Sequence, residues 1–504
     1  MNNEKRINLK TLIILICCFI ITFCAVFVFT FTIFKTSSTN RYITDIKKTS
    51  SNGLIDTYTI TYSNGLSSFF TITNGSDGED ANDITINQVY QELVNQGYNK
   101  GFDAFLKEYL NYEQTTTNKT ANINKAMLSA VSVYSEFPVK VEEPTYSYHP
   151  ILGYIQSGSQ IVNKTSVGAG SGVIYNLDKE NGNAYIITNY HVVYNNNCVT
   201  TNKIGKVHVF LYGSTTEISL KDSDSNQDGY PDVVYGNSAI ECEYIGGSLV
   251  YDIAVLKITN SEILKNSDAK NIVFAEDYSV GETAIAIGNP EAEGISVTQG
   301  IVSVDSEIIT MYGVDEQTLV EFRTMRIDTA INSGNSGGGL FNEQGELIGI
   351  VNAKIVDEEI ENIAYAIPRD IVKNVVENII YNNTTNSLNC VNKIVLGVSL
   401  SSENSFAMWD NNTQTTKIYE DIVIASVDNN SLAKTLNFTP GDVIKSLKIN
   451  SNTYEGENLR RYFNVIDLIL NIRVGDNVTF NILRNNTNTT ISFTATSEMF
   501  QNIK

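Results

Sequence analysis

Short β-forming segments, separated by Gly- and Asn-rich turns, occupy most of the chain from about residue 122 to residue 368. Repeated short strands with turn signals between them are typical of a β-sandwich or a β-barrel. The chain has 504 residues, which is enough for two to four domains. Its hydrophobic content of 42% is sufficient for packed cores. We therefore expect a mainly β fold with more than one domain.

The charge balance excludes one class of partner. The chain has 35 basic and 56 acidic residues, and its formal net charge is −21. A nucleic-acid-binding surface needs a basic face to neutralise phosphates, so nucleic acid is not an expected partner. Three cysteines lie beyond the N-terminal region, at Cys198, Cys242 and Cys390. They allow at most one disulfide between them, and no CxxC pattern indicates zinc.

An uncharged run, 11–34, follows a basic N-terminal tail, 1–10, that contains Lys5, Arg6 and Lys10. A helix needs roughly 20 apolar residues to cross a bilayer, and this run is long enough. A cleaved signal peptide is the alternative, but its apolar region would be about 7–15 residues and would end at a small-x-small site. No such site closes this run, so we favour an uncleaved transmembrane anchor. The basic flank predicts a cytoplasmic N-terminus and an extracytoplasmic remainder at the cell membrane.

Residues 35–121 are predicted to be a linker that contains two small modules. The segment 57–73 alternates β-forming residues around Asn64-Gly65, which is a strong hairpin signal because Asn-Gly tolerates the positive φ of a tight turn. The segment 84–112 shows helical spacing of its aromatic residues. Neither module carries a recognisable chemical motif, so a spacer role is the simpler interpretation.

The stretch INSGNSGGGLF, residues 331–341, surrounds Ser336 with glycines. Glycine permits a turn that aims successive backbone N–H groups at one point, and a tetrahedral oxyanion needs such donors. A phosphate-binding loop is the rival interpretation, but no Lys-Ser/Thr pair follows the glycines. We therefore interpret Ser336 as a candidate nucleophile, which requires a base and a carboxylate elsewhere in the chain.

The base is sought among the three histidines of the chain. His149 precedes a proline in a loop, and His208 lies in an alternating strand, where a strand-face role is expected. His191 follows the apolar strand AYIITNY, which would deliver it at a loop. Asp252 stands before the apolar segment IAVLKI, and a carboxylate there is costly to bury unless it is paired. His191 and Asp252 are therefore the candidate base and its partner.

Three motifs, in the order His, Asp, Ser, now resemble the trypsin-like HtrA/DegP family of serine proteases. They are TNYHVV (188–193), YDIAVLKI (251–258) and INSGNSGG (331–338). GAGSGVIY (168–175), AIGNP (286–290) and VTQGIVSV (297–304) resemble further strands of the same family. The resemblance covers roughly residues 122–380.

The resemblance implies a double β-barrel over 122–380, with the triad between the two barrels. Ser336 would be the nucleophile, His191 the general base and then acid, and Asp252 the residue that orients His191. The backbone N–H groups of Gly334 and Ser336 would form the oxyanion hole. The implied reaction is serine endopeptidase chemistry through an acyl-enzyme, and it requires no cofactor, ATP or metal.

Three positions qualify this interpretation. The family usually has proline immediately before and after its GNSGG motif, where this chain has Ser333 and Gly339. This departure keeps open a catalytically weak or inactive scaffold that acts as a chaperone or peptide-binding sensor. Ala330 stands where trypsin-like enzymes carry an acidic specificity residue. A neutral residue there argues against cleavage after Lys or Arg and favours small aliphatic side chains.

The C-terminal part of the chain, 392–497, follows a helix at 371–380 and a polar linker, 381–391. SLAKTLNFTPGDVIKSLKIN and VGDNVTFNILRN resemble segments of PDZ domains, and a helix is expected at 464–472. The resemblance implies that the backbone around Leu396, Gly397 and Val398 binds a C-terminal carboxylate while the peptide adds as a strand. A packed β-module without a ligand is the alternative.

An acidic segment, DSDSNQDGYPD, suggests a structural Ca²⁺ site. It places Asp224, Asn226, Asp228 and Asp232 around a glycine bend, as a hard cation prefers. A full EF-hand is excluded because Tyr235 stands where the bidentate acid would be. A solvated acidic turn is the alternative.

Together these patterns predict a membrane-anchored, extracytoplasmic serine endopeptidase with one PDZ domain. The expected substrates are misfolded or exported proteins, engaged through apolar C-termini. The family resemblance also implies a homotrimer.

Overall fold

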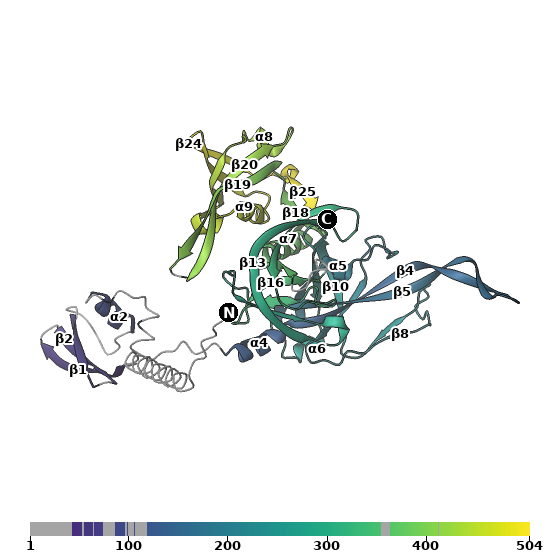
Figure 1. The fold of residues 1–504 in the computed structure, drawn as a ribbon, viewed down its shortest axis with the longest axis horizontal. Coiled ribbons are helices and arrows are strands. Elements are labelled where there is room, and N and C mark those ends of the chain that lie inside the picture. The colour runs from purple at the N-terminus through teal and green to yellow at the C-terminus, as the bar shows by residue number, and fades with distance from the viewer. Residues whose placement is uncertain are drawn as a thin grey trace, which may run out of the picture. The chain divides into compact units, whose positions relative to one another are not determined.

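The computed structural model describes residues 43–52, 55–63, 65–73, 86–95, 98, 105, 118–353, 363–411 and 413–503. The chain divides into two compact units, Met1–Thr117 and Asn118–Lys504, and each is described by itself (Figure 1). Within the described residues, no helix is both long and apolar enough to span a bilayer. The predicted anchor at 11–34 and most of the predicted helical module at 84–112 lie outside those residues.

The first unit contains a small antiparallel sheet and one described helix. The sheet consists of β1 (Ile43–Asn52), β2 (Ile55–Tyr62) and β3 (Ser67–Thr73), and the helix is α2 (Ile86–Asn95). β2 and β3 pair across the predicted hairpin, and Gly65 has the positive φ of +78° that the turn requires. The predicted linker, 35–121, is wrong at β1, which precedes the predicted hairpin. The side chains of β1 are mostly polar and exposed, so they give no hydrophobic pattern that predicts a strand. The strand forms because its backbone pairs with β2.

Two closed β-barrels form the first part of the second unit, as the predicted mainly β architecture requires. The first barrel contains β4 (Ala130–His149), β5 (Gly153–Asp178), β6 (Asn183–Thr188), β7 (Lys206–Leu211), β10 (Ile240–Ser248) and β11 (Ile253–Ile258), in the order β10-β11-β6-β5-β4-β7. The second contains β12 (Thr283–Gly288), β13 (Ser296–Tyr312), β14 (Leu319–Ile327), β15 (Gly339–Phe341), β16 (Leu347–Asn352) and β17 (Ala364–Pro368), in the order β12-β13-β14-β17-β16-β15. Closure leaves no unpaired sheet edge around either barrel.

Smaller elements complete the barrel region. They are α4 (Lys119–Met127), α5 (Tyr190–Val193), α6 (Glu262–Lys265), the two-stranded sheet β8 (Ile218–Leu220) and β9 (Val233–Tyr235), and a short 3-10 helix, Pro290–Ala292. The interior of the first barrel is filled by branched side chains, including Val131, Ile174, Ile186 and Leu256. Alternate inward-facing residues on every strand supply this core, which fixes the register of the barrel.

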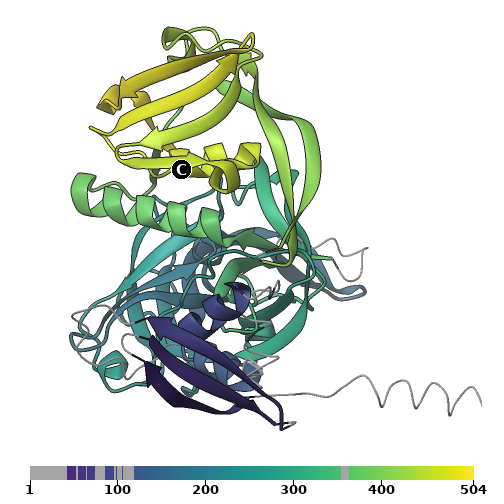
Figure 2. The ribbon, with the colours of Figure 1, turned by 90° about the vertical axis from the view of Figure 1, so that its left-hand side faces the viewer.

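Helix α7 (Arg369–Asn386) lies between the barrels and the C-terminal domain (Figure 2). The prediction that 381–391 is a linker is wrong for its first half, since α7 continues to Asn386 and ends at Ser387, which has a φ of +54°. Asn382 Nδ2 donates to the Asn378 carbonyl at 2.8 Å, and Asn383 Nδ2 donates to the Ile245 carbonyl at 3.1 Å. Asn and Thr usually favour loops, but tertiary contacts and side-chain bonds back to the helix override that preference here.

The C-terminal domain is a sheet with one long side closed by helix α9 (Tyr462–Ile469). The sheet order is β19 (Val398–Asp410), β20 (Thr415–Val427), β21 (Val443–Ile449), β23 (Asn477–Arg484) and β24 (Thr487–Thr494), and β22 (Asn452–Glu455) pairs with β21. Also present are α8 (Leu432–Thr435), the 3-10 helices Gly456–Leu459 and Ser497–Met499, and the strand pair β18 (Val391–Ile394) and β25 (Phe500–Ile503). The predicted end at residue 497 is therefore too early, because β25 returns to pair with β18.

A buried ion pair fastens the last hairpin of this domain. Asp442 has a fully buried side chain and accepts hydrogen bonds from Arg484 Nε and Nη2, both at 2.7 Å, and from the Thr439 N–H at 2.8 Å. Burial alone would raise the pKa of the Asp442 carboxyl, but the bonds from Arg484 and Thr439 hold that pKa below its ordinary value. This stabilisation is therefore present above about pH 4 and is lost as the pH falls toward the folded-state pKa.

We expect Arg484→Gln to lower the free energy of unfolding by about 2–3 kcal/mol at pH 7, because it leaves a buried carboxylate acceptor without its cation. The gap to the wild type should shrink near pH 3, where the wild type loses the contribution of Asp442. Urea unfolding followed by Trp409, the single tryptophan of the chain, measures this domain. Lys448→Gln, at an exposed position of β21, is the control. An equal difference in the free energy of unfolding between variant and wild type at both pH values would contradict the role of the ion pair.

Candidate active site

His191 and Asp252 are brought together by adjacent strands of the first barrel. β6 delivers His191 into the short helix α5, and Asp252 stands in the turn between β10 and β11. His191 Nδ1 lies 2.7 Å from Asp252 Oδ2, and the His191 N–H donates to Asp252 Oδ1 at 2.9 Å. One carboxylate therefore binds both the ring and the backbone of the histidine, which fixes the orientation of the imidazole.

Two asparagines support Asp252, and sequence reasoning did not find them. Asn352 Nδ2, at the end of β16 in the second barrel, donates to Asp252 Oδ2 at 2.9 Å. Asn189 Nδ2 donates to the Asp252 carbonyl at 2.9 Å. Asp252 is only 3% exposed and has a φ of +48°, a conformation that Asp tolerates better than most residues. The polar Asn352 at the end of the apolar run GELIGIV was the available sequence signal.

Ser336 lies in the loop between β14 and β15, and its backbone contacts the first barrel. The Ser171 N–H donates to the Ser336 carbonyl at 2.8 Å. The Ser336 side chain accepts a hydrogen bond from the Ala353 N–H at 3.2 Å. Within residues 118–353, the structure records no hydrogen bond between Ser336 and His191. All three predicted triad residues therefore lie where the two barrels contact each other, and the serine hydroxyl is bonded to backbone.

The Ser333–Gly334 peptide has a defined orientation. The Ser333 carbonyl accepts a hydrogen bond from the Glu291 N–H at 2.8 Å. In a trans peptide the C=O and N–H point in opposite directions, so the Gly334 N–H faces away from Glu291. In the described barrel region, neither the Gly334 N–H nor the Ser336 N–H donates a hydrogen bond. Both predicted oxyanion-hole donors are therefore available to a ligand.

Glycine is required at position 334 for two reasons. Its φ is +90°, and a Cβ atom there would lie 2.3 Å from the Asn289 carbonyl oxygen. Ser171 connects the same segments, because its Oγ donates to the Gly334 carbonyl and accepts from the Asn289 N–H, both at 2.7 Å. Sequence reasoning did not single out Ser171, which has no motif signal apart from its place in GAGSGVIY.

The structure shows what surrounds Gly339, Ser333 and Ala330, the three positions that qualified the family resemblance. Gly339 opens β15, and a Cβ atom there would lie 2.3 Å from the Phe341 ring. Ser333 is exposed and uses its carbonyl to hold Glu291. Ala330 is exposed, and its carbonyl accepts a hydrogen bond from Thr298 Oγ1 at 2.8 Å. A side chain larger than glycine at 339 would thus require Phe341 to move.

A groove lies between β19 and α9 in the C-terminal domain. Its cavity volume is about 310 Å³, and the predicted carboxylate-binding residues Leu396, Gly397 and Val398 line it together with Val465 and Ile469 of α9. The N–H groups of Leu396 and Gly397 donate no hydrogen bond within residues 363–411 or 413–503. Gly397 has a φ of +70°, and a Cβ atom there would lie 2.4 Å from Ser431 Cβ. The groove thus combines apolar walls with free backbone donors at one end.

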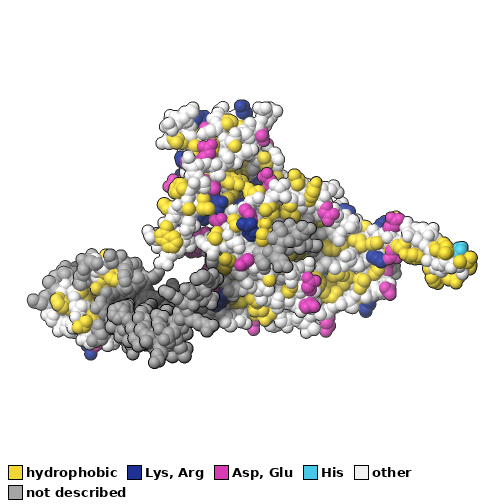
Figure 3. Space-filling view, in the orientation of Figure 1, with side chains coloured by type: hydrophobic (Ala, Val, Ile, Leu, Met, Phe, Trp, Pro, Cys, Tyr) yellow, Lys and Arg dark blue, Asp and Glu magenta, His cyan; other side chains and the backbone are white. Residues whose placement is uncertain are grey.

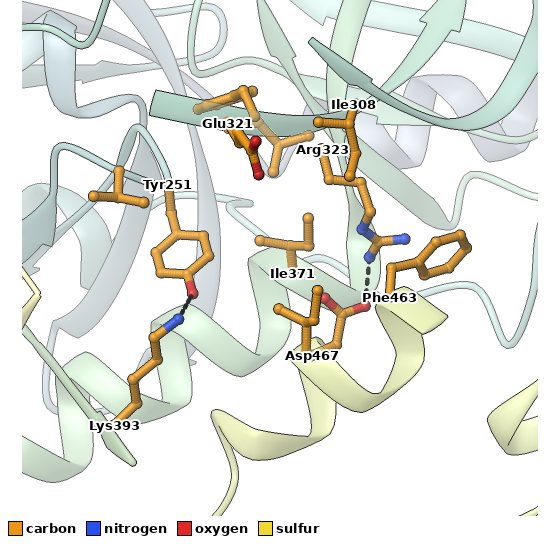
Figure 4. Close-up of a pocket in the computed structure, with 12 residues that line it drawn as sticks. Tyr251, Ile308, Glu321, Arg323, Ile371, Lys393, Phe463 and Asp467 are labelled. Carbon is orange, nitrogen blue, oxygen red and sulfur yellow. Dashed lines mark hydrogen bonds and ion pairs between the residues drawn. The ribbon is translucent and has the colours of Figure 1, made fainter. Parts of the chain in front are cut away.

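A second cavity, of about 190 Å³, lies where the second barrel meets α9 (Figure 4). Arg323 Nη2 contacts Asp467 Oδ2 at 2.5 Å, and Lys393 Nζ donates to the Tyr251 hydroxyl at 2.7 Å. Burial raises the pKa of Asp467 to about 7, although Arg323 opposes the shift. None of the triad residues lines this cavity, so it is a junction between domains and not the reaction centre.

The acidic segment 222–232 uses its carboxylates to organise its own backbone. Asp224 accepts hydrogen bonds from the N–H groups of Asp228, at 3.0 Å, and Gly229, at 2.9 Å. Asp232 accepts from the Ser225 N–H at 2.8 Å, and the bonds from Ser225 lower the pKa of the Asp232 carboxyl. Among the described residues, no group of three His, Cys, Asp or Glu side chains is arranged to hold a metal. Ca²⁺ binding by Asp224, Asn226, Asp228 and Asp232 stays a prediction.

The other two histidines lie apart from the triad. His208, in β7, is buried, stacks on Tyr235 with a centroid separation of 3.8 Å, and lies 3.4 Å from Glu136 Oε1. His149 ends β4, at the turn into β5. Cys198, Cys242 and Cys390 are buried.

Comparisons with known proteins find sequence similarity to serine proteases. Residues 170–350 match the family model described as trypsin-like peptidase domain. Serine protease Do-like HtrA of Bacillus subtilis (strain 168) is 30% identical over 340 residues, which are 65% of this chain and only 64% of that protein. Serine protease Do-like HtrB of the same strain is 28% identical over 419 residues, which are 77% of this chain and 78% of that protein. A solved structure described as HtrA-type protease AlgW with decapeptide aligns with a TM-score of 0.43 at 23% identity, over 74% of this chain and 97% of that chain.

Two closed barrels with His191, Asp252 and Ser336 at their junction define the trypsin-fold class. Within that class, the peptidase-domain match and the two Bacillus relatives show that the chain is similar to HtrA serine proteases. The resemblance that the three sequence motifs predicted is confirmed.

Proposed function

We propose that this chain is a serine endopeptidase that cleaves proteins through an acyl-enzyme formed on Ser336. The observation that carries the proposal is the pairing of His191 Nδ1 with Asp252 Oδ2 at 2.7 Å in the barrel that the Ser336 backbone contacts. This bond places a proton on Nδ1 and leaves Nε2 free to accept the proton of the serine hydroxyl.

The reaction begins when the Ser336 side chain exchanges the Ala353 N–H for His191 Nε2. The Ser336 side chain has to rotate for this exchange, and catalytic hydrogen bonds are often formed only with substrate present. Ser336 Oγ then attacks the scissile carbonyl while His191 takes its proton. His191 returns the proton to the leaving amine, and water repeats the sequence to release the acyl group.

The negative charge on the tetrahedral intermediate needs donors that are already in place. The Gly334 and Ser336 N–H groups are unoccupied in the described barrel region, and the Ser333–Glu291 bond holds the first of them in orientation. Removing one such donor typically costs roughly 3–4 kcal/mol of transition-state stabilisation. The supporting contacts favour a hole that exists before substrate binds.

The groove of the C-terminal domain supports recognition of C-terminal peptides by a PDZ-like domain. β19 is the edge strand of its sheet, so an extended peptide could pair with it. Leu396, Gly397 and Val398 stand at the end of the groove where the free carboxylate would bind. Val465 and Ile469 on α9 supply an apolar wall for the last side chain of the peptide.

We further propose that the chain is a single-pass protein of the cell membrane, anchored by residues 11–34 with its N-terminus in the cytoplasm. The catalytic and C-terminal domains would be extracytoplasmic and would act on misfolded or exported proteins. The homotrimer implied by the family resemblance is part of the same proposal. The uncharged run and its basic flank support the topology.

One observation favours a second candidate, a peptide-binding scaffold with little or no catalysis. Ser336 Oγ is bonded to the Ala353 N–H and not to His191 in the described structure. If substrate does not release the hydroxyl, the chain would bind proteins through its groove without cleaving them.

Covalent labelling with a fluorophosphonate tests the proposed peptidase directly. We expect the full chain to be labelled on Ser336, with the signal abolished in Ser336→Ala. Labelling should be measured alone, with unfolded casein, and with a peptide that has an apolar C-terminus, because a bound peptide could assist exchange of the hydroxyl. Absence of labelling under all three conditions would exclude the peptidase and leave the scaffold.

A further inference from the structure

Strands β4 and β5 continue far beyond the first barrel as a two-stranded arm (Figure 1). β4 pairs with β7 only as far as Glu136, and β5 pairs with β6 only from Val173 onward. The last described support on the β4 side is the bridge between Val139 and Cys198. With a rise of about 3.3 Å per residue, the turn after His149 lies roughly 30 Å beyond that bridge.

The base of the arm is held by hydrogen bonds to the acidic segment 222–232 and carries charged side chains. Asn163 Nδ2 donates to the Gly229 carbonyl at 2.9 Å, and Thr165 Oγ1 donates to the Pro231 carbonyl at 2.6 Å. Glu143 and Lys164 form an ion pair across the two strands. The acidic segment 222–232 therefore supports the arm up to this pair, and the outer part extends freely.

Beyond the Glu143–Lys164 pair the arm has no formal charge. The sequence from Pro144 to Asn163, PTYSYHPILGYIQSGSQIVN, contains no Asp, Glu, Lys or Arg. The chain as a whole is 18% charged, so this stretch differs sharply from the average surface. Hydrophobic side chains gather at the end of the arm (Figure 3).

The side chains at the end of the arm are ordered by depth. Ile151 and Leu152 occupy the turn and are 86% and 70% exposed. Tyr148 and Tyr154 face each other one step back, with ring centroids 5.5 Å apart, and Tyr146 follows on the same side of the ribbon. His149 Nδ1 accepts weak bonds from the Ile151 and Leu152 N–H groups, which closes the turn.

We infer that the end of this arm docks into the surface of a lipid bilayer. Aliphatic side chains at the apex, tyrosines behind them and charges only at the base match the order of apolar core, interface and water across a membrane surface. A stable protein partner would need roughly 800 Å² of surface from each side, whereas the apex is a single turn on a two-stranded ribbon. The chain also carries its own predicted membrane segment at 11–34, so a bilayer is an expected neighbour.

The inference goes beyond the proposed peptidase and does not depend on it. The anchor at 11–34 would keep the protein at the membrane, while the arm would fix the distance and orientation of the first barrel relative to that surface. Because the anchor would hold the chain at the bilayer, the weaker attachment through the arm would form at a high effective concentration.

Fluorescence quenching by brominated lipids tests the docking without reference to catalysis. Residues 118–504 form a compact unit with their own hydrophobic cores and lack the predicted anchor. In this unit, Trp409→Phe removes the single native tryptophan, and Ile151→Trp places a reporter at the apex. The control reporter is Val273→Trp, at a position on the barrel surface that is 59% exposed. The probe is a vesicle of brominated phosphatidylcholine, whose neutral surface avoids repulsion from an acidic protein.

We expect the Ile151→Trp signal to fall by at least half at millimolar lipid, and the Val273→Trp signal to change by less than a tenth. The same two reporters in the full chain, reconstituted in brominated vesicles, give a second measurement. Quenching at 151 only in the full chain would support docking that the anchor assists. Equal quenching at the two positions in both preparations would overturn the inference. Cross-linking of apex to apex between copies, without quenching, would overturn it in favour of a second copy of the chain.

Discussion

Asp252→Asn is expected to lower kcat/KM for an unfolded protein substrate by roughly 10⁴-fold, as loss of the orienting carboxylate does in triad enzymes generally. The carboxylate accepts bonds from His191 Nδ1 and from the His191 N–H. In the variant, the amide oxygen would keep the backbone bond, and the amide nitrogen would then face Nδ1 as a donor. The imidazole would be forced into the tautomer that carries its proton on Nε2, where it could not accept the proton of Ser336.

The side chain changes little in volume, so the fold should survive, and a melting curve checks this. Asp222→Asn is the matched control, because it makes the same chemical change at an exposed position of the acidic segment. Its kcat/KM should stay within about twofold of the wild type. A loss of less than tenfold in Asp252→Asn would show that other groups set the tautomer of His191.

The triad could be predicted from the sequence because each of its residues sits in a local pattern that its chemistry demands. His191 follows a strand, Asp252 precedes one, and Ser336 lies among glycines that the loop geometry requires. The supporting residues Asn189, Asn352 and Ser171 could not be found in the same way. Their roles come from contacts with partners far along the chain, such as the bond from Asn352 to Asp252. Nothing in their immediate surroundings distinguishes them from ordinary polar residues.

The errors in the fold have a related cause. β1 and the end of α7 are both polar in composition, and both are held by partners outside the segment. The same holds for β25, which exists because it pairs with β18. The loop predicted around His149 is instead the end of β4, because a ribbon without a buried face lacks the inside-outside alternation that marks a strand. Amino-acid composition predicts which segments are buried. These elements are held mainly by hydrogen bonds to distant segments, which composition does not show.

Gly334→Ala is expected to reduce kcat by roughly 10²–10³-fold, through loss of one oxyanion-hole donor. The added Cβ atom would lie 2.3 Å from the Asn289 carbonyl oxygen and 3.0 Å from the Glu291 nitrogen, and both are backbone atoms that cannot swing away. The Ser333–Gly334 peptide would have to rotate, which would break the bond from Glu291 to the Ser333 carbonyl and turn the Gly334 N–H out of the hole. Substrate binding outside the loop should be little affected, so KM should change less than kcat.

Gly281→Ala is the control that separates the effect of the positive φ from the effect of the collision between the new Cβ atom and its neighbours. Gly281 has a φ of +87°, close to the +90° of Gly334, but a Cβ atom there would meet nothing within 4 Å. Both variants should lose about 1–3 kcal/mol of stability from the positive φ, and the collision in Gly334→Ala should add to its loss. Only Gly334→Ala should lose activity and fluorophosphonate labelling. If the two variants kept equal activity, the Ser333–Glu291 bond would not be what positions the hole, and the loop would have to acquire its active geometry only when substrate binds.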